Sequence, residues 1–260
     1  GKIVRYRDGN AEDFVPARAH GLWMVNGMKA DAERRALWVA SSAGDNLVDK
    51  VPGPGQPAGL FRFDLDTGEP EGRWLLDDAD TVHFLNDLVV APNGDVYVTH
   101  MFDKAAVYRL EAATGTFSPF YKGDADFSHP NGITLDPAGE NLFVAHRGGI
   151  SKISINDRER CPIELPDHAL PSGIDGLYWH RSALVAVHPG AAAVRRYELS
   201  VTGERVVSAS TLEADHPAFH IPTTGVLVDD SLFVMANSQF DAFEDGELWP
   251  LERLLSLIHI

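Results

Sequence analysis

The chain has 260 residues, of which 44 % are apolar, and its 22 Lys and Arg against 38 Asp and Glu give a formal net charge of −16. This composition can bury a core and excludes wholesale disorder, and the negative charge argues against nucleic acids and anionic membranes as partners. The single cysteine excludes an internal disulfide, and no apolar stretch reaches the ~18 residues of a membrane span.

The amino-terminal segment begins within a strand pattern. Residues 1–17 are predicted to form two strands, and the chain starts at Gly1. We therefore expect residues 1–20 to be the remnant of a repeat whose inner strands lie upstream. A signal peptide would also lie upstream, so the compartment is left open.

A polar dipeptide recurs along the rest of the chain, each time opening an apolar run. The five dipeptides are Asn26-Gly27, Asn86-Asp87, Asn131-Gly132, Asp175-Gly176 and Thr224-Gly225. A second apolar run follows each of them, at residues 37–40, 96–99, 142–145, 184–187 and 232–235. A repeat of roughly 45 residues built from short strands is typical of propeller blades.

Turn residues and third strands complete the repeats. Pro-Asn-Gly-Asp at 92–95 and Asp-Pro-Ala-Gly at 136–139 separate paired strands, and third strands are predicted at 59–63, 106–110, 150–153 and 194–199. Residues 45–59, rich in Pro and Gly, are predicted to be a loop. We predict an all-β fold: one six-bladed β-propeller domain of four-stranded blades over residues 1–260, with the first blade truncated at the N-terminus.

The carboxyl-terminal tail, residues 255–260, is expected to be non-native. Its sequence Leu-Ser-Leu-Ile-His-Ile is the translation, in one frame, of a transposon adapter used in sequencing libraries. A true closing strand is the alternative.

Three motifs resemble those of the senescence-marker-protein/gluconolactonase (regucalcin-like) family of six-bladed propellers, and more distantly of the paraoxonases. They are Phe-Leu-Asn-Asp-Leu at 84–88, His-Pro-Asn-Gly-Ile at 129–133 and Ser-Gly-Ile-Asp-Gly-Leu at 172–177. The resemblance implies a Ca²⁺ or another divalent cation on the propeller axis, with Asn131 and Asp175 as ligands and Asn86 beside the ion handling substrate or metal. The family's first-blade Glu has no counterpart here, and the paraoxonase His pair is absent from the second blade.

Reach also supports an axial cation. Inner strands of six blades converge to a radius of ~7 Å, an Asn or Asp oxygen reaches about 3.6 Å from its Cα, and a Ca²⁺–oxygen bond adds about 2.4 Å. The polar residues that open consecutive inner strands could therefore meet at one hard cation; they are Asn26, Asn86, Asn131 and Asp175. The alternative is that these dipeptides only make turns at strand entrances.

Three histidines form a second set. His100, His146 and His188 each end a second strand. Second strands lie ~5 Å further from the axis, so the three imidazoles cannot share a zinc ion at about 2.1 Å. We expect them around the same mouth, where one could contact substrate or carry a proton. Bonding to neighbouring loops is the alternative.

These observations predict a divalent-metal-dependent hydrolase of a lactone or related small ester. Asp175 and Asn86 are the predicted catalytic residues, and Asn86, Asn131 and Asp175 the predicted metal ligands. Asn26 is predicted to contact the small-molecule substrate, together with the three histidines. A non-enzymatic propeller that binds a small molecule or a protein, and a strictosidine-synthase-like lyase, are the alternatives. Substrate, compartment and oligomeric state stay open.

Overall fold

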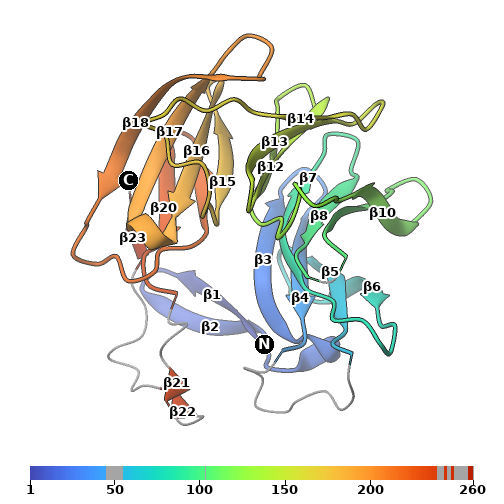
Figure 1. Cartoon of the computed structure of the whole chain (residues 1–260). Helices are drawn as coiled ribbons and strands as arrows, with labels where there is room; N and C mark the ends of the chain where they lie inside the picture. Colours follow the sequence, from blue (N-terminus) through green and yellow to red (C-terminus); the bar gives the residue numbers. More distant parts are fainter. Residues whose placement is uncertain (45–54, 103, 239–242, 245–246, 249–256, 260) are drawn as a thin grey trace. The chain divides into compact units, whose positions relative to one another are not determined.

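The computed structural model describes residues 1–44, 55–102, 104–238, 243–244, 247–248 and 257–259. Nearly all regular structure in these residues is antiparallel β-sheet, and the chain forms two compact units, Gly1–Pro130 and Asn131–Ile260 (Figure 1). None of the helices in the described part of the chain has the length and apolar character that a membrane span needs.

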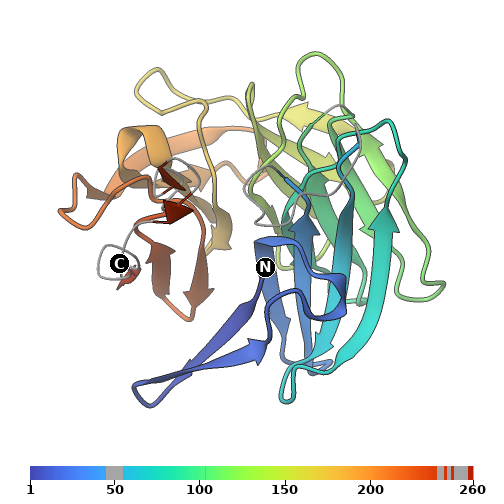
Figure 2. The ribbon, with the colours of Figure 1, turned by 90° about the horizontal axis from the view of Figure 1, so that it is seen from below.

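Unit 1 contains a hairpin and two four-stranded sheets. β1 (Ile3–Arg7) pairs with β2 (Asn10–Val15), and the short 3₁₀ helix η1 (Ala19–Gly21) follows. Figure 2 shows this hairpin, in dark blue, beside the first four-stranded sheet. That sheet contains β3 (Met24–Asp31), β4 (Ala36–Ser42), β5 (Ala58–Asp64) and β6 (Pro70–Leu76). The second sheet contains β7 (Leu85–Val90), β8 (Val96–His100), β9 (Ala106–Leu110) and β10 (Phe117–Lys122).

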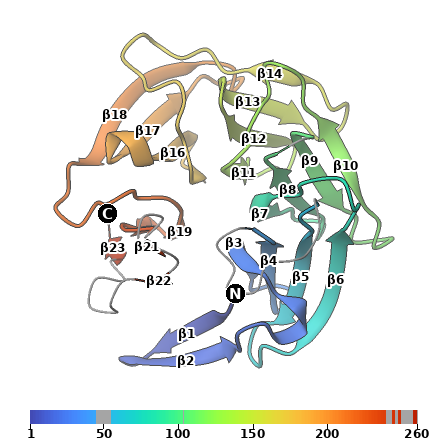
Figure 3. The ribbon, with the colours of Figure 1, turned by 60° about the horizontal axis from the view of Figure 1, so that its bottom comes forward.

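Unit 2 repeats the pattern twice, as the sheets β11–β14 and β15–β18 in Figure 3 show. The first of these sheets contains β11 (Ile133–Leu135), β12 (Asn141–His146), β13 (Gly149–Ser154) and β14 (Arg160–Pro162). The second contains β15 (Leu177–His180), β16 (Ala183–His188), β17 (Ala193–Leu199) and β18 (Val206–Ala214), with the 3₁₀ helix η2 (Pro189–Ala191) after β16. Each of the four larger sheets is therefore a meander of consecutive strands, which is consistent with the predicted β-propeller.

Shorter sheets end the chain. β19 (Gly225–Val228), β20 (Ser231–Met235) and β23 (Leu257–His259) form one sheet, and β21 (Phe243–Glu244) pairs with β22 (Glu247–Leu248). β23 places part of the tail beside β20, with Ile258 opposite Val234. Whether the tail is native stays a prediction.

The second strand of each of the four larger sheets is buried because its side chains face a neighbouring sheet or the core on both sides. All five residues of β8 are buried, and so are the last five residues of β12. This explains why these segments are continuous apolar runs in the sequence rather than alternating ones. The outermost strand β18, in contrast, is mostly exposed.

Apolar side chains hold neighbouring sheets together within each unit. In unit 1, Trp38 and Leu60 of the first sheet pack with Leu85 and Val98 of the second. In unit 2 the cluster between β11–β14 and β15–β18 includes Phe143, Leu177, Leu184 and Tyr197, and a further cluster joins β16 to β20 through Val187 and Val234. Burial of each such side chain contributes roughly 1.5–3 kcal/mol.

The predicted turns are confirmed. Gly94 has φ of 89° and its N–H donates to Ala91 O at 2.8 Å, while Gly139 has φ of 70° and donates to Asp136 O at 3.0 Å. Both positions require the left-handed backbone that glycine adopts without strain. The predicted loop at residues 45–59 lies outside the described residues up to 54, and at its other end Ala58 and Gly59 belong to β5 rather than to a loop.

Candidate functional site

The predicted dipeptides open the first strands through a shared β-bulge. Asn131 N–H donates to Ala145 O at 2.8 Å, and Ala145 N–H donates to Gly132 O at 2.9 Å. In the same way, Asp175 N–H donates to Val187 O and Val187 N–H donates to Gly176 O, both at 2.9 Å. Two residues of the first strand therefore face one residue of the second, which turns the side chain of the first out of the regular alternation.

The register of unit 1 places two asparagines at the same position. Gly27 pairs with Ala40 across a register shift, so Asn26 is the extra residue of β3. A register shift between Leu85 and Leu88 similarly accommodates Asn86 in β7. Asn26, Asn86, Asn131 and Asp175 are thus structurally equivalent, and all four are half-buried.

The last repeat differs from the sequence interpretation by one residue. Thr223 N–H donates to Met235 O at 3.1 Å, and Met235 N–H donates to Thr224 O at 2.8 Å. The equivalent of Asn131-Gly132 is therefore Thr223-Thr224, and Thr224-Gly225 is wrong by one position. The sequence interpretation aligned Gly225 with the glycines of the other dipeptides, whereas the hydrogen bonds place Thr224 at that position.

The first strands lie side by side, and small residues permit the contact. A Cβ on Gly132 would lie 2.2 Å from the carbonyl oxygen of Asp175, and Gly176 N–H donates to Thr223 O at 3.3 Å. In unit 1 a Cβ on Gly27 would lie 2.4 Å from Asn86 O. The dipeptide glycines are thus required by close backbone approach.

The structure brings the predicted residues together within each unit. Asn26 lies next to the first strand that carries Asn86, because its Nδ2 donates to Leu85 O at 2.7 Å and to Ser42 Oγ at 3.1 Å. In unit 2, Asn131 and Asp175 lie on adjacent first strands.

The donor set fits a hard cation. At the bulge positions of unit 2, Asn131, Asp175 and Thr223 supply an amide, a carboxylate and a hydroxyl oxygen, which are ligand types that Ca²⁺ accepts. No group of three or more His, Cys, Asp or Glu side chains suited to a metal occurs among the residues the structure describes. The amide, carboxylate and hydroxyl at these positions are oxygen donors, the ligand type of hard cations.

The three predicted histidines also share one register position. Each follows directly on the residue opposite the bulge: His100 after Thr99, His146 after Ala145 and His188 after Val187. All three are buried, at 0, 6 and 1 % exposure. Their role in substrate binding stays a prediction.

In unit 2 these histidines are bonded to hydroxyl groups of their own sheet. Gly148 N–H donates to His146 Nδ1 at 3.1 Å, so neutral His146 carries its proton on Nε2 and donates it to Ser151 Oγ at 2.8 Å. His188 Nε2 lies 2.9 Å from the hydroxyl of Tyr197, and burial lowers the pKa of His188 to about 4. His188 is therefore a neutral imidazole near pH 7.

In unit 1 the equivalent histidine belongs to a chain of titratable groups. His100 Nε2 lies 2.9 Å from His83 Nδ1, and His83 Nε2 lies 3.3 Å from Asp78 Oδ2. A hydrogen bond from Thr81, together with His83 and Lys104, lowers the pKa of Asp78, so this group is a carboxylate. His83 therefore lies between His100 and the Asp78 carboxylate, and the tautomers of the two imidazoles decide which nitrogen donates in the contact between them.

Sequence reasoning missed Asp78 and His83. His83 directly precedes the motif at 84–88, which was the available signal, but the loop that carries it had no predicted partner. The pairing depends on the fold, because it joins a loop before β7 to the end of β8.

Known structures share this fold. The chain is similar to a gluconolactonase from Xanthomonas campestris, at 17 % identity and a TM-score of 0.63, over 91 % of this chain and 76 % of that one. It is similar to the allergen Mala s 1 of Malassezia sympodialis, at 14 % identity and a TM-score of 0.64, over 88 % of this chain and 78 % of that one. It is also similar to a glucose dehydrogenase, at 13 % identity and a TM-score of 0.61, over 92 % of this chain and 88 % of that one. No protein-family model and no curated protein matches the sequence.

These neighbours and the four-stranded meanders define the class: the fold is of the β-propeller type. The resemblance to the senescence-marker-protein/gluconolactonase family, drawn from the motifs, is confirmed at the level of the fold by the gluconolactonases among the neighbours.

Proposed function

We propose that this protein hydrolyses a lactone or a related small ester with the help of a divalent cation, Ca²⁺ in the first instance. The observation that carries the proposal is the set of oxygen-bearing side chains at one bulge position on successive first strands. A fold shared with a gluconolactonase supports it. In this proposal the five repeats and the hairpin β1–β2 are parts of a six-bladed propeller.

Asn131 and Asp175, on adjacent first strands of unit 2, would hold the cation. Asp175 is the one carboxylate among the bulge positions, so it supplies the formal charge that amide and hydroxyl ligands lack. When bound, the cation would polarise the ester carbonyl and stabilise the negative charge that develops on its oxygen.

Protein side chains would orient the substrate and move the proton. Asn86 and Asn26 offer amide groups at the equivalent positions of unit 1, where Asn26 is already held by Leu85 O and Ser42 Oγ. A side chain fixed in this way loses little freedom on binding substrate, which favours productive alignment. Asp175 would accept a proton from the attacking water.

The test is a panel of lactones and aryl esters, assayed with added Ca²⁺ and with a chelator. We expect hydrolysis that requires the cation and is lost in Asp175→Asn, with Gly190→Ala as a control because a Cβ at Gly190 meets nothing within 4 Å. Hydrolysis that persists in the chelator would contradict the metal role. Binding of a lactone without turnover would instead indicate a non-enzymatic binding propeller.

A further inference from the structure

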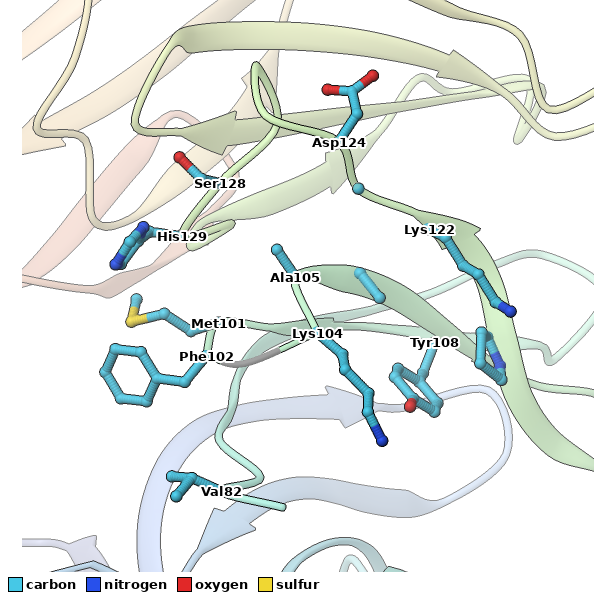
Figure 4. A pocket seen from close by; sticks show the side chains of 13 residues that line it. Val82, Met101, Phe102, Lys104, Ala105, Tyr108, Lys122, Asp124, Ser128 and His129 are labelled. Carbon is cyan, nitrogen blue, oxygen red and sulfur yellow. The ribbon is translucent and has the colours of Figure 1, made fainter. Parts of the chain in front are cut away.

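Unit 1 contains a cavity of about 1030 Å³ at the ends of β8, β9 and β10 (Figure 4). None of the bulge residues lines it, so it is separate from the proposed cation site. Ligand pockets are commonly about 300–1,000 Å³. The cavity therefore accommodates a molecule larger than a simple sugar lactone.

One end of the cavity is apolar and aromatic. Phe102 lines it and is 37 % exposed, a large exposure for this side chain. Its ring lies 5.0 Å from that of Phe84 and 6.1 Å from that of His129, which it meets edge-on. Met101 lies beside Phe102 in Figure 4. An aromatic face held in place but left open favours an apolar or aromatic ligand group.

The backbone of His129 is unusual at this end. Its φ is 52°, in the left-handed region that non-glycine residues seldom adopt. This conformation places the imidazole against Phe102 at the cavity wall.

The other end of the cavity is cationic. In Figure 4 the amino groups of Lys104 and Lys122 lie on the same side as the hydroxyl of Tyr108, away from Phe102. Lys104 Nζ donates to Thr81 Oγ1 at 3.2 Å and lies 3.5 Å from Asp78 Oδ2, which fixes its position. Lys122 has no ion-pair partner among the residues the structure describes.

Tyr108 adds a neutral donor between the lysines. It is 7 % exposed, and burial, with the nearby charge of Asp78, raises the pKa of its phenol. The hydroxyl therefore keeps its proton and can donate it to an anion.

The acidic side chain in the cavity wall does not neutralise these cations. Asp124 Oδ1 accepts the backbone N–H groups of Asp126 and Phe127, both at 3.0 Å. Figure 4 shows its carboxylate turned away from Lys122 and Lys104. The Asp78 carboxylate, 3.5 Å from Lys104 Nζ, offsets the charge of that lysine, so Lys122 supplies the positive charge that is left for a ligand of the cavity.

We propose that this cavity binds an amphipathic carboxylate, a molecule with one carboxylate and an apolar or aromatic tail. The carboxylate lies between Lys104, Lys122 and the Tyr108 hydroxyl, and the tail lies against Phe102, Met101 and His129. This binding activity uses none of the residues assigned to lactone hydrolysis and does not need a cation.

The test is calorimetric titration of the full chain with 4-phenylbutyrate, in a chelator, against the neutral amide of the same acid. We expect the carboxylate to bind about tenfold or more tightly than the amide, because charge-assisted hydrogen bonds are lost with the charge. Lys122→Met, which keeps the apolar stem, should weaken binding by about tenfold, and Phe102→Ala by a similar factor. Lys2→Met is the matched control, because Lys2 pairs with Asp13 on the hairpin β1–β2.

Circular dichroism of each variant separates lost binding from lost fold. Equal affinity for acid and amide, an unchanged affinity in folded Lys122→Met, or no binding of 4-phenylbutyrate would overturn the proposal. The proposal would also be overturned if Asp175→Asn weakened the binding of 4-phenylbutyrate and the cavity variants did not, since the probe would then occupy the bulge site. Because the titration contains a chelator and measures no turnover, failure of the proposed hydrolase leaves its outcome unaffected.

Discussion

The two units place histidines at the same register position and surround them differently. In unit 2, His146 and His188 are bonded to the hydroxyls of Ser151 and Tyr197, which belong to their own sheets. In unit 1, His100 is bonded to a second histidine, and that one faces the carboxylate of Asp78. The strand pattern fixes where such a side chain lies, whereas the fold decides whether its partner is a hydroxyl of the same sheet or a second titratable side chain.

The bulge positions show the same contrast. Unit 1 presents two neutral amides, Asn26 and Asn86, and unit 2 presents an amide, a carboxylate and a hydroxyl. The same backbone position therefore holds only neutral side chains in unit 1 and includes one charged side chain, Asp175, in unit 2. The following predictions test that comparison, from the largest expected effect to the smallest.

Gly132→Ala should destabilise the protein by about 3 kcal/mol, because the new Cβ would lie 2.2 Å from Asp175 O and the first strands of unit 2 would have to separate. Gly190→Ala in the same unit should be nearly neutral, since nothing lies within 4 Å of its Cβ. Urea denaturation of both variants measures the difference. Equal midpoints would show that close strand approach does not explain the dipeptide glycine.

Acidification should destabilise the protein through His188. Its folded pKa of about 4 lies below the ordinary value of 6.5, so the unfolded state binds more protons between these values. The stability is therefore present above about pH 6.5 and is lost as the pH falls toward 4, by at most ~3 kcal/mol. Denaturation at several pH values should show a flatter dependence in His188→Gln, and an unchanged slope would refute the assignment.

His83→Leu should destabilise unit 1 by about 2 kcal/mol, because it leaves the buried Nε2 of His100 without its imidazole partner. Asp78→Asn keeps the two imidazoles together and should cost less. Long-range ¹H–¹⁵N spectra of the histidines report the proton positions directly. We expect His83 to be protonated on Nε2 in the parent, facing the Asp78 carboxylate, and the opposite tautomer would contradict this contact.

Asp175→Asn should weaken Ca²⁺ binding by about tenfold, or ~1.4 kcal/mol, because it preserves shape and removes the one formal charge at the bulge positions. Asn131→Ala should weaken it less, since water can replace one neutral oxygen. Calorimetric titration with Ca²⁺ compares the two, with circular dichroism as the check on folding. A larger loss in Asn131→Ala would reverse the roles given to amide and carboxylate.

His146→Ala should leave Ca²⁺ affinity nearly unchanged in the folded protein. Its imidazole is bonded to Ser151 Oγ and to Gly148 N–H, within the sheet β11–β14. The same titration measures this variant. Loss of Ca²⁺ binding here, with Asp175→Asn silent, would place the cation among the histidines.

The repeat pattern was readable from the sequence because it depends on local chemistry. Continuous apolar runs such as 96–99 and 142–145 mark strands buried on both faces, and Gly94 and Gly139 mark turns that need a left-handed backbone. The same logic located Asn131 and Asp175 next to glycines that close backbone contact requires.

Only the tertiary structure decided the partners and the exact register. Thr223, rather than Thr224, occupies the bulge position, because its N–H donates to Met235 O. A strand pairing shifted by one residue leaves the sequence pattern unchanged, so the sequence could not distinguish the two threonines. The pairing of His100 with His83, and the joining of Phe102 to Lys104 and Lys122 around one cavity, depend on how loops and strand ends fold back on each other. Periodicity reports which face of a strand is buried, whereas contacts between residues distant along the chain arise only when the sheets pack.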